Sequence, residues 1–169
     1  MAMSSYVRTL RSHVGHARLL MPSVAGIIRD DQHRILLVQV RDDGTWTTPG
    51  GSMDPDETPA DAVVREVWEE TGLVVEPARI IAVYGGRTFV VRYPNGDETQ
   101  YVSILFDCSV RSGTLQESGD DGDEIQAARF WSRDEAERLQ VSAWLRDLLP
   151  HLYEADGKSW FQPPTWRPS

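Results

Sequence analysis

Three glutamates, Glu66, Glu69 and Glu70, stand at positions i, i+3 and i+4 of one segment. In an α-helix, at about 100° per residue, they share one face, where like charges repel. Arg65 is the only base in this acidic stretch. Such a concentration of carboxylates suits a hard cation, Mg²⁺ or Mn²⁺, which commonly takes its other ligands from water and substrate phosphates. The spacing indicates phosphate-ester or phosphoanhydride chemistry, with a solvated acidic face as the alternative.

The flanking residues predict the helix that would carry these carboxylates. Thr58 suits an N-cap, Pro59 the first helical position and Gly72 the position after the last turn. We therefore expect a helix over residues 59–71. Its buried stripe is expected to be apolar, made of Ala60, Val63, Val64, Val67 and Trp68.

The wider pattern runs from Gly51 to Leu73. Gly51 is followed after five residues by Glu57, and after seven more by Arg-Glu-Val-Trp-Glu-Glu-Thr-Gly-Leu at positions 65–73. This resembles the signature of the Nudix hydrolase family, Gly-x5-Glu-x7-Arg-Glu-U-x-Glu-Glu-x-Gly-U, where U is aliphatic. Every specified position matches. Pro-Gly-Gly at 49–51 is also similar to the family's approach to this box, although Thr48 stands where relatives usually carry an apolar residue.

The resemblance implies an α/β (α+β) chain with the Nudix fold. That fold is a mixed β-sheet sandwiched between helices, to which this chain would add an N-terminal helix. It implies metal-dependent hydrolysis of a nucleoside diphosphate linked to another moiety, as in a nucleoside triphosphate or a nucleotide sugar such as ADP-ribose. The alternative is a catalytically silent nucleotide-binding or sensor module, and the intact box counts against it.

Position by position, the resemblance implies metal ligands and catalytic groups. Glu66, Glu69 and Glu70 would bind Mg²⁺ or Mn²⁺, together with the main-chain carbonyl of Gly50. Glu66, Glu69 and Glu124 are the candidate catalytic residues. Either Glu66 or Glu124 would be the general base that takes a proton from water. Glu124 could instead belong to a solvated acidic loop.

The same resemblance implies a structural pair in the box, in which Glu57 binds Arg65 and steadies the loop against the helix. Outside the box, the candidate substrate-binding residues are Arg41, Trp46, Arg87 and Tyr101. The arginines could meet phosphates and the aromatic rings could stack on a base or sugar. The alternatives are surface ion pairs for the arginines and core packing for the rings.

Periodicity predicts the remaining elements. We expect an amphipathic helix within residues 3–20, stopped by Pro22, and a second helix over residues 142–154. Strands are expected at residues 24–28, 35–40, 73–75, 79–84, 87–93, 99–110 and 127–131. The predicted division is a helical extension over 1–21, a hydrolase domain over 22–155 and a C-terminal tail over 156–169.

Composition limits the classes of partner. The chain has 169 residues, a net charge of −9 and a single cysteine, Cys108. The negative charge argues against stable binding to nucleic acid, and no apolar run is long enough to span a membrane. One cysteine and the lack of a signal-peptide pattern predict a cytoplasmic protein. The basic N-terminal segment beside an acidic body is compatible with a homodimer.

Overall fold

The computed structural model describes residues 4–119, 124–154 and 158–167. Its helices are α1 (Ser5–Val14), α2 (Pro59–Thr71), α3 (Arg133–Ala136) and α4 (Ala143–Leu152). Its strands are β1 (Leu19–Ile28), β2 (Ile35–Val40), β3 (Trp46–Thr47), β4 (Gly50–Ser52), β5 (Leu73–Tyr84), β6 (Val90–Arg92), β7 (Glu98–Gly113), β8 (Ile125–Trp131) and β9 (Trp160–Phe161).

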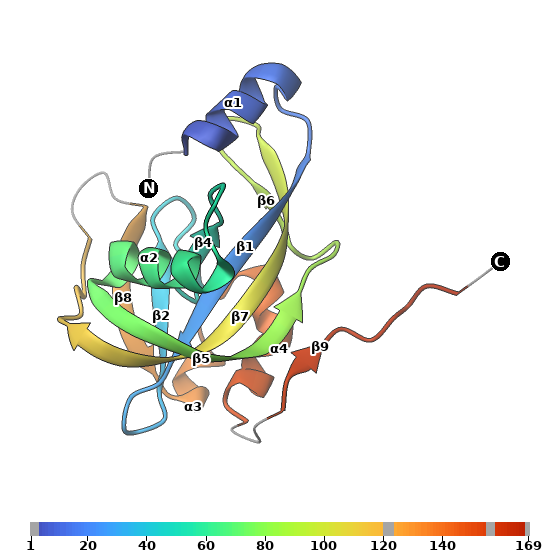
Figure 1. Ribbon diagram of the computed structural model, residues 1–169. Coiled ribbons are helices and arrows are strands. Elements are labelled where there is room, and N and C mark those ends of the chain that lie inside the picture. The colour runs from blue at the N-terminus through green and yellow to red at the C-terminus, as the bar shows by residue number, and fades with distance from the viewer. Residues whose placement is uncertain (1–3, 120–123, 155–157, 168–169) are drawn as a thin grey trace.

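The strands form two sheets (Figure 1). The larger has the order β4–β1–β7–β5–β9, with β6 paired to β7, and the smaller has the order β3–β2–β8. β1 runs parallel to β7, whereas β4 on β1 and β5 on β7 are antiparallel. The larger sheet is therefore mixed, and it brings the start of the box at β4 beside β1.

Two apolar clusters pack against the sheets. Ile27 and Leu37 belong to the cluster that includes α4, whereas their neighbours Ile28 and Leu36 belong to the cluster that includes α2. Because side chains alternate along a strand, β1 and β2 bury both of their faces. The predicted mixed sheet between helices is thus confirmed.

The expected helix in the box is present as α2, but its buried stripe differs from the prediction. Its buried residues are Ala62, Val63, Glu66, Val67 and Thr71. Trp68 is 56% exposed and Ala60 is also exposed. The prediction was wrong because it placed only apolar residues inside. The inward face is centred on Val63 and Val67, and at helical spacing it also includes Glu66.

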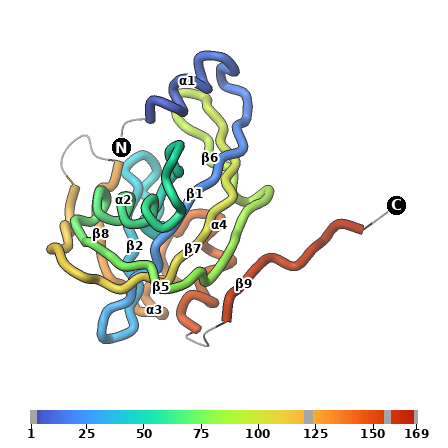
Figure 2. The backbone as a smooth tube through the Cα atoms, viewed as in Figure 1, coloured from blue at the N-terminus to red at the C-terminus, as the bar shows by residue number. Residues whose placement is uncertain are grey.

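The N-terminal helix is shorter than predicted. α1 ends at Val14, where Gly15 adopts a φ of 59° and its N–H bonds to the carbonyl of Arg11. Residues 19–20 lie instead in β1 and pair with the start of β7. Pro22 therefore lies within β1 and does not stop the helix. α1 sits beside β6 and the start of β7, in the same arrangement in Figures 1 and 2.

Three strand predictions also change. The two strands expected at 73–75 and 79–84 form one strand, β5, whose register shifts near Pro77. The strand expected at 87–93 is limited to β6, and residues 160–161 of the expected tail form β9, which pairs parallel to β5. After β9 the chain runs away from the body (Figure 2). In the described part of the chain, no helix is long and apolar enough to cross a membrane.

Candidate active site

The ends of α2 are fixed by local hydrogen bonds. Thr58 Oγ1 accepts from the N–H of Asp61 at 3.1 Å, and Pro59 occupies the first turn. At the other end, Gly72 adopts a left-handed conformation with φ of 72°, and its N–H donates to the carbonyl of Trp68. A side chain is disfavoured in that conformation, so glycine ends the helix.

The second wall of the site is β4, which approaches α2 closely. A Cβ on Gly51 would lie 2.6 Å from the carboxyl carbon of Glu66, too close for any real side chain. A Cβ on Gly50 would collide with the backbone of Val24. The two glycines therefore let β4 fit between β1 and the carboxylate of Glu66.

Arg65 links the loop to the helix and also binds two of the box carboxylates. Its Nε and Nη2 donate to Glu57 at 2.6 and 2.8 Å. Its Nη1 donates to Glu66 at 2.8 Å and to Glu69 at 3.2 Å. The hydrogen bonds from Arg65 hold the pKa of Glu57 below its usual value. Glu57 is therefore charged and fixed to the helix at neutral pH.

Burial makes Glu66 unusually basic. Glu66 is only 2% exposed, and the loss of hydration raises the pKa of its carboxyl group to about 7. The hydrogen bond and the charge of Arg65 act in the opposite direction, and the charges of Glu69 and Glu124 raise the pKa further. Arg65 therefore does not fully compensate the negative charge of ionised Glu66.

The charged form of Glu70 is disfavoured in the same way. Burial raises its pKa well above the usual value, and the charges of Glu66 and Glu124 add to the effect. The N–H of Gly50 donates to Glu70 Oε2 at 2.9 Å and partly offsets it. Two neighbouring carboxylates thus favour protonation or the arrival of a cation.

Glu124 lies far from the box in sequence but close to it in space. Its charge raises the pKa of both Glu66 and Glu70. Its carbonyl accepts from the N–H of Arg41 at 2.8 Å, which fixes the start of the segment leading to β8. Its side chain is exposed. The fold therefore brings the exposed carboxylate of Glu124 toward those of Glu66 and Glu70.

The carboxylates have the donor atoms of a divalent-metal site, but in the described part of the chain they do not converge on one point. No three histidine, cysteine, aspartate or glutamate side chains among the described residues surround a point that could hold a metal ion. Arg65 occupies one oxygen of Glu66 and one of Glu69, and Gly50 occupies one of Glu70. The second oxygen of each has no hydrogen bond within the described ranges and could bind a cation. All-oxygen donors fit Mg²⁺ or Mn²⁺.

The other sequence candidates lie in different surroundings. Trp46 packs edge-on against Trp131, with ring centroids 4.9 Å apart, as core packing would require. Arg87 is exposed in the turn after β5, and among the described residues no contact joins it to the box. Arg41 is tied to the Glu124 segment through its backbone and donates weakly to the carbonyl of Gly119 at 3.5 Å.

Tyr101 is the substrate candidate that contacts the box. Its hydroxyl accepts from Ser52 Oγ at 3.4 Å and lies 2.9 Å from the hydroxyl of Tyr93. Ser52 and Tyr93 were not predicted as site residues. The contacts that these two residues make with Tyr101 depend on how β4 and the β6–β7 hairpin fold toward each other. In the sequence, only the hairpin turn after Tyr93 indicated that this segment folds back on itself.

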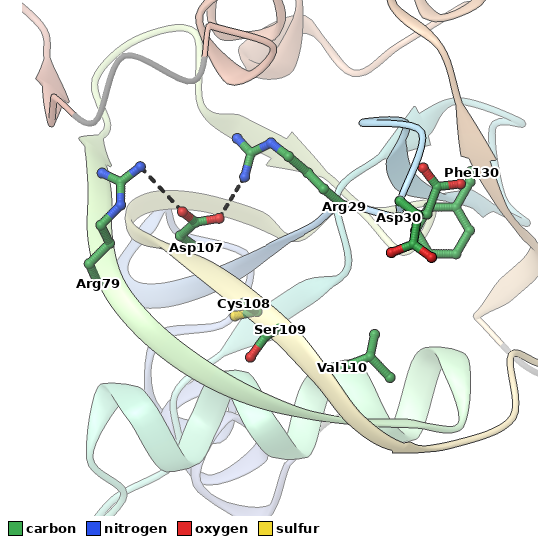
Figure 3. A pocket seen from close by; sticks show the side chains of 9 residues that line it. Arg29, Asp30, Arg79, Asp107, Cys108, Ser109, Val110 and Phe130 are labelled. Atoms are coloured by element: carbon green, nitrogen blue, oxygen red, sulfur yellow. Dashed lines mark hydrogen bonds and ion pairs between the residues drawn. The ribbon is translucent and has the colours of Figure 1, made fainter.

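A separate hollow of about 670 Å³ lies near the end of β1 (Figure 3). There Arg29 and Arg79 both point at Asp107, at 2.5 and 3.2 Å. Arg29 also donates to the carbonyl of Leu152 at the end of α4. Cys108 lines the hollow, and burial raises its pKa to about 12, so its thiol is protonated. These charges hold elements together, and none belongs to the carboxylate site.

Comparison with known proteins agrees with this geometry. The family model of the NUDIX domain matches residues 19–152. A MutT-like protein of Streptomyces ambofaciens is 33% identical over 143 residues, covering 80% of this chain and 84% of the relative. An ADP-ribose pyrophosphatase of Methanocaldococcus jannaschii is 38% identical over 112 residues, covering 63% of this chain and 62% of the relative.

The solved structures include a similar protein as well. An ADP-ribose pyrophosphatase from Streptococcus suis superposes with a TM-score of 0.61 at 30% identity, covering 84% of this chain and 96% of its own. The family model spans strands β1 to β8 and the box helix α2. The chain therefore belongs to the Nudix family and is a hydrolase that cleaves pyrophosphate bonds in nucleoside diphosphate derivatives.

Proposed function

We propose that the hydrolysis depends on Mg²⁺, or on Mn²⁺, held by Glu66, Glu69 and Glu70 with the main-chain carbonyl of Gly50. The observation that carries this proposal is the placement of Glu66 and Glu70 on one face of α2, where burial raises both pKa values and Arg65 is the one guanidinium that contacts Glu66 among the described residues. A bound divalent cation would polarise phosphoryl oxygens, lower the pKa of a bound water and neutralise developing negative charge.

In this proposal Glu124 is the general base. Its carboxylate is exposed, whereas that of Glu66 is buried and already accepts a hydrogen bond from Arg65. Glu124 would take a proton from the attacking water while the new P–O bond forms and the bridging P–O bond breaks. The negative charge of Glu69 would help to balance the positive charge of the cation. Glu57 would keep Arg65 in place.

We propose a nucleoside triphosphate or a nucleotide sugar such as ADP-ribose as the substrate, because two similar proteins are named ADP-ribose pyrophosphatases. Tyr101 is the best-supported substrate contact, since its hydroxyl reaches Ser52 at the end of β4. Arg41 is a second candidate near Glu124. A cytoplasmic location and a homodimer, suggested by the basic N-terminal segment, remain part of the proposal.

A turnover panel tests the proposal. Release of phosphate, pyrophosphate or nucleoside monophosphate is measured with Mg²⁺ for nucleoside triphosphates, ADP-ribose, UDP- and GDP-sugars, NADH and dinucleoside polyphosphates. Glu70→Gln is the matched blank. We expect turnover of one substrate class, lost without Mg²⁺ and lost in the variant. Equal turnover by Glu70→Gln would reject the metal site.

A further inference from the structure

Three hydroxyl groups form a row beside the box, which we call the hydroxyl row: Ser52, Tyr101 and Tyr93. The Tyr93 and Tyr101 hydroxyl oxygens lie 2.9 Å apart, and Ser52 Oγ lies a looser 3.4 Å from Tyr101. The main-chain carbonyl of Ser52 also accepts from Arg65 Nη2 at 3.2 Å. The row therefore begins at the residue that joins β4 to the carboxylate network.

The row has one proton more than its contacts use. Each hydroxyl has one proton to donate and two lone pairs to accept with. Two contacts within the row use two of the three protons, so one O–H has no acceptor among the described residues. An unused donor next to a catalytic site is available to a substrate oxygen.

The rest of the structure holds Tyr101 in a fixed position. Its ring lies 5.5 Å from that of Phe89, which itself stacks on Trp144 at 4.7 Å. Its N–H donates to the carbonyl of Phe89 at 3.0 Å. Tyr93 and Tyr101 are only partly buried, so part of each residue remains open to solvent. A rigid aromatic anchor with a polar tip is suited to recognition of a specific group.

Electrostatics decide between a phosphate and a neutral group as the partner of the row. Burial and the neighbouring Tyr101 raise the pKa of Tyr93, so its hydroxyl is uncharged. The charge of Glu124 also reaches Tyr93, as it does the box carboxylates. The nearby Arg11 is already paired with Asp97. The carboxylate of Glu124 would repel a phosphate at Tyr93, whereas it would not repel a neutral sugar hydroxyl.

We propose that the hydroxyl row binds a ribose hydroxyl of the nucleotide, with Tyr101 as the contact and Tyr93 as its positioning residue. This rests on the proposed function and narrows its substrate class to ribonucleotides. The 2′- and 3′-hydroxyls share the required chemistry, because each can both donate and accept hydrogen bonds.

The test uses a nucleotide that cannot be cleaved. In α,β-methylene adenosine diphosphate a CH₂ group replaces the bridging oxygen. Its affinity, and those of its 2′-deoxy and 3′-deoxy forms, are measured by calorimetry with Mg²⁺. We expect one deoxy form to bind about three- to tenfold more weakly than the parent, the size of one neutral hydrogen bond. Which form is weaker identifies the hydroxyl.

Variants then assign that difference to the row. Tyr101→Phe should abolish the preference for the ribose form, and Tyr93→Phe should reduce it, with little change for the deoxy form. The matched control is Tyr153→Phe, which removes a tyrosine hydroxyl bonded to the carbonyl of Trp131 at 2.8 Å, outside the row. This control should keep the full preference.

Three results would overturn the proposal: equal affinities for all three compounds, no measurable binding of any, or a preference that survives in Tyr101→Phe. Turnover in the substrate panel is scored separately. Turnover combined with equal affinities would reject the hydroxyl row alone. A panel with no turnover would instead reject the proposed function.

Discussion

Gly51→Ala perturbs the site through one atom. The new Cβ would lie 2.6 Å from the Glu66 carboxyl carbon, whereas ordinary contact begins at 3.4 Å. The difference, 3.4 − 2.6, requires the carboxylate or β4 to move by at least 0.8 Å. Misplacement of a catalytic group by about 1 Å can lower a rate by about 100-fold. We therefore expect kcat to fall by about that factor.

The fold should survive this change. Overpacking at one position costs about 1–3 kcal/mol of unfolding free energy. The matched control is Gly44→Ala in the β2–β3 turn, where φ is 70° and the nearest atom to a Cβ would be 3.9 Å away. Left-handed backbone should cost that variant about 1–2 kcal/mol without a loss of kcat. Steady-state kinetics and denaturant unfolding measure both. A normal kcat in Gly51→Ala, or equal losses in the two variants, would refute the reasoning.

Three further predictions follow from the ion pairs and pKa values. Because Glu66 has a folded-state pKa of about 7, above its ordinary 4.5, the metal-free protein should lose stability as pH rises from 4.5 to 7. Mg²⁺ affinity by calorimetry should weaken by about tenfold per pH unit below pH 7, for one displaced proton. A pH-independent affinity would contradict this. Glu57→Gln should cost about 1–2 kcal/mol of unfolding free energy at pH 7, by losing its bonds to Arg65. Since the folded-state pKa of Glu57 is lowered, this difference should shrink as pH falls below about 4.5; a constant difference would argue against the pair. Arg11→Ala should weaken the attachment of α1 to the rest of the protein. No residue of α1 is in the buried class, so the helix depends on the pair between Arg11 and Asp97, whose side chains are only 9% and 6% exposed. Hydrogen exchange should speed up in α1 and not in α2, and continued protection of α1 would count against this role.

The box helix could be predicted from the sequence because its signals are local. Thr58, Pro59 and Gly72 mark its ends, and the structure has α2 between them. The inward turn of Glu66 could not be predicted from polarity, because it depends on a glycine in β4 and on the guanidinium of Arg65.

Errors elsewhere arose where distant pairing decides the local structure. Residues 19–20 look helical by spacing, but pairing with β7 makes them part of β1. Residues 160–161 lie in a Pro-rich segment and become β9 only because the edge of β5 is free to pair with them. The hydroxyl row depends on the same kind of contact, since Ser52 lies in β4 and Tyr93 follows β6.

The central claim is that the acidic face of α2 holds the divalent cation needed for hydrolysis. The most direct test is a calorimetric titration of Mn²⁺ into the wild type, Glu70→Gln and the control Glu137→Gln, with turnover measured on the same samples. Glu137 is an exposed helix-end glutamate paired only with Arg133 in the described structure. We expect the wild type and Glu137→Gln to bind Mn²⁺ and turn over equally, and Glu70→Gln to lose both. Unchanged Mn²⁺ affinity and turnover in Glu70→Gln would contradict the account.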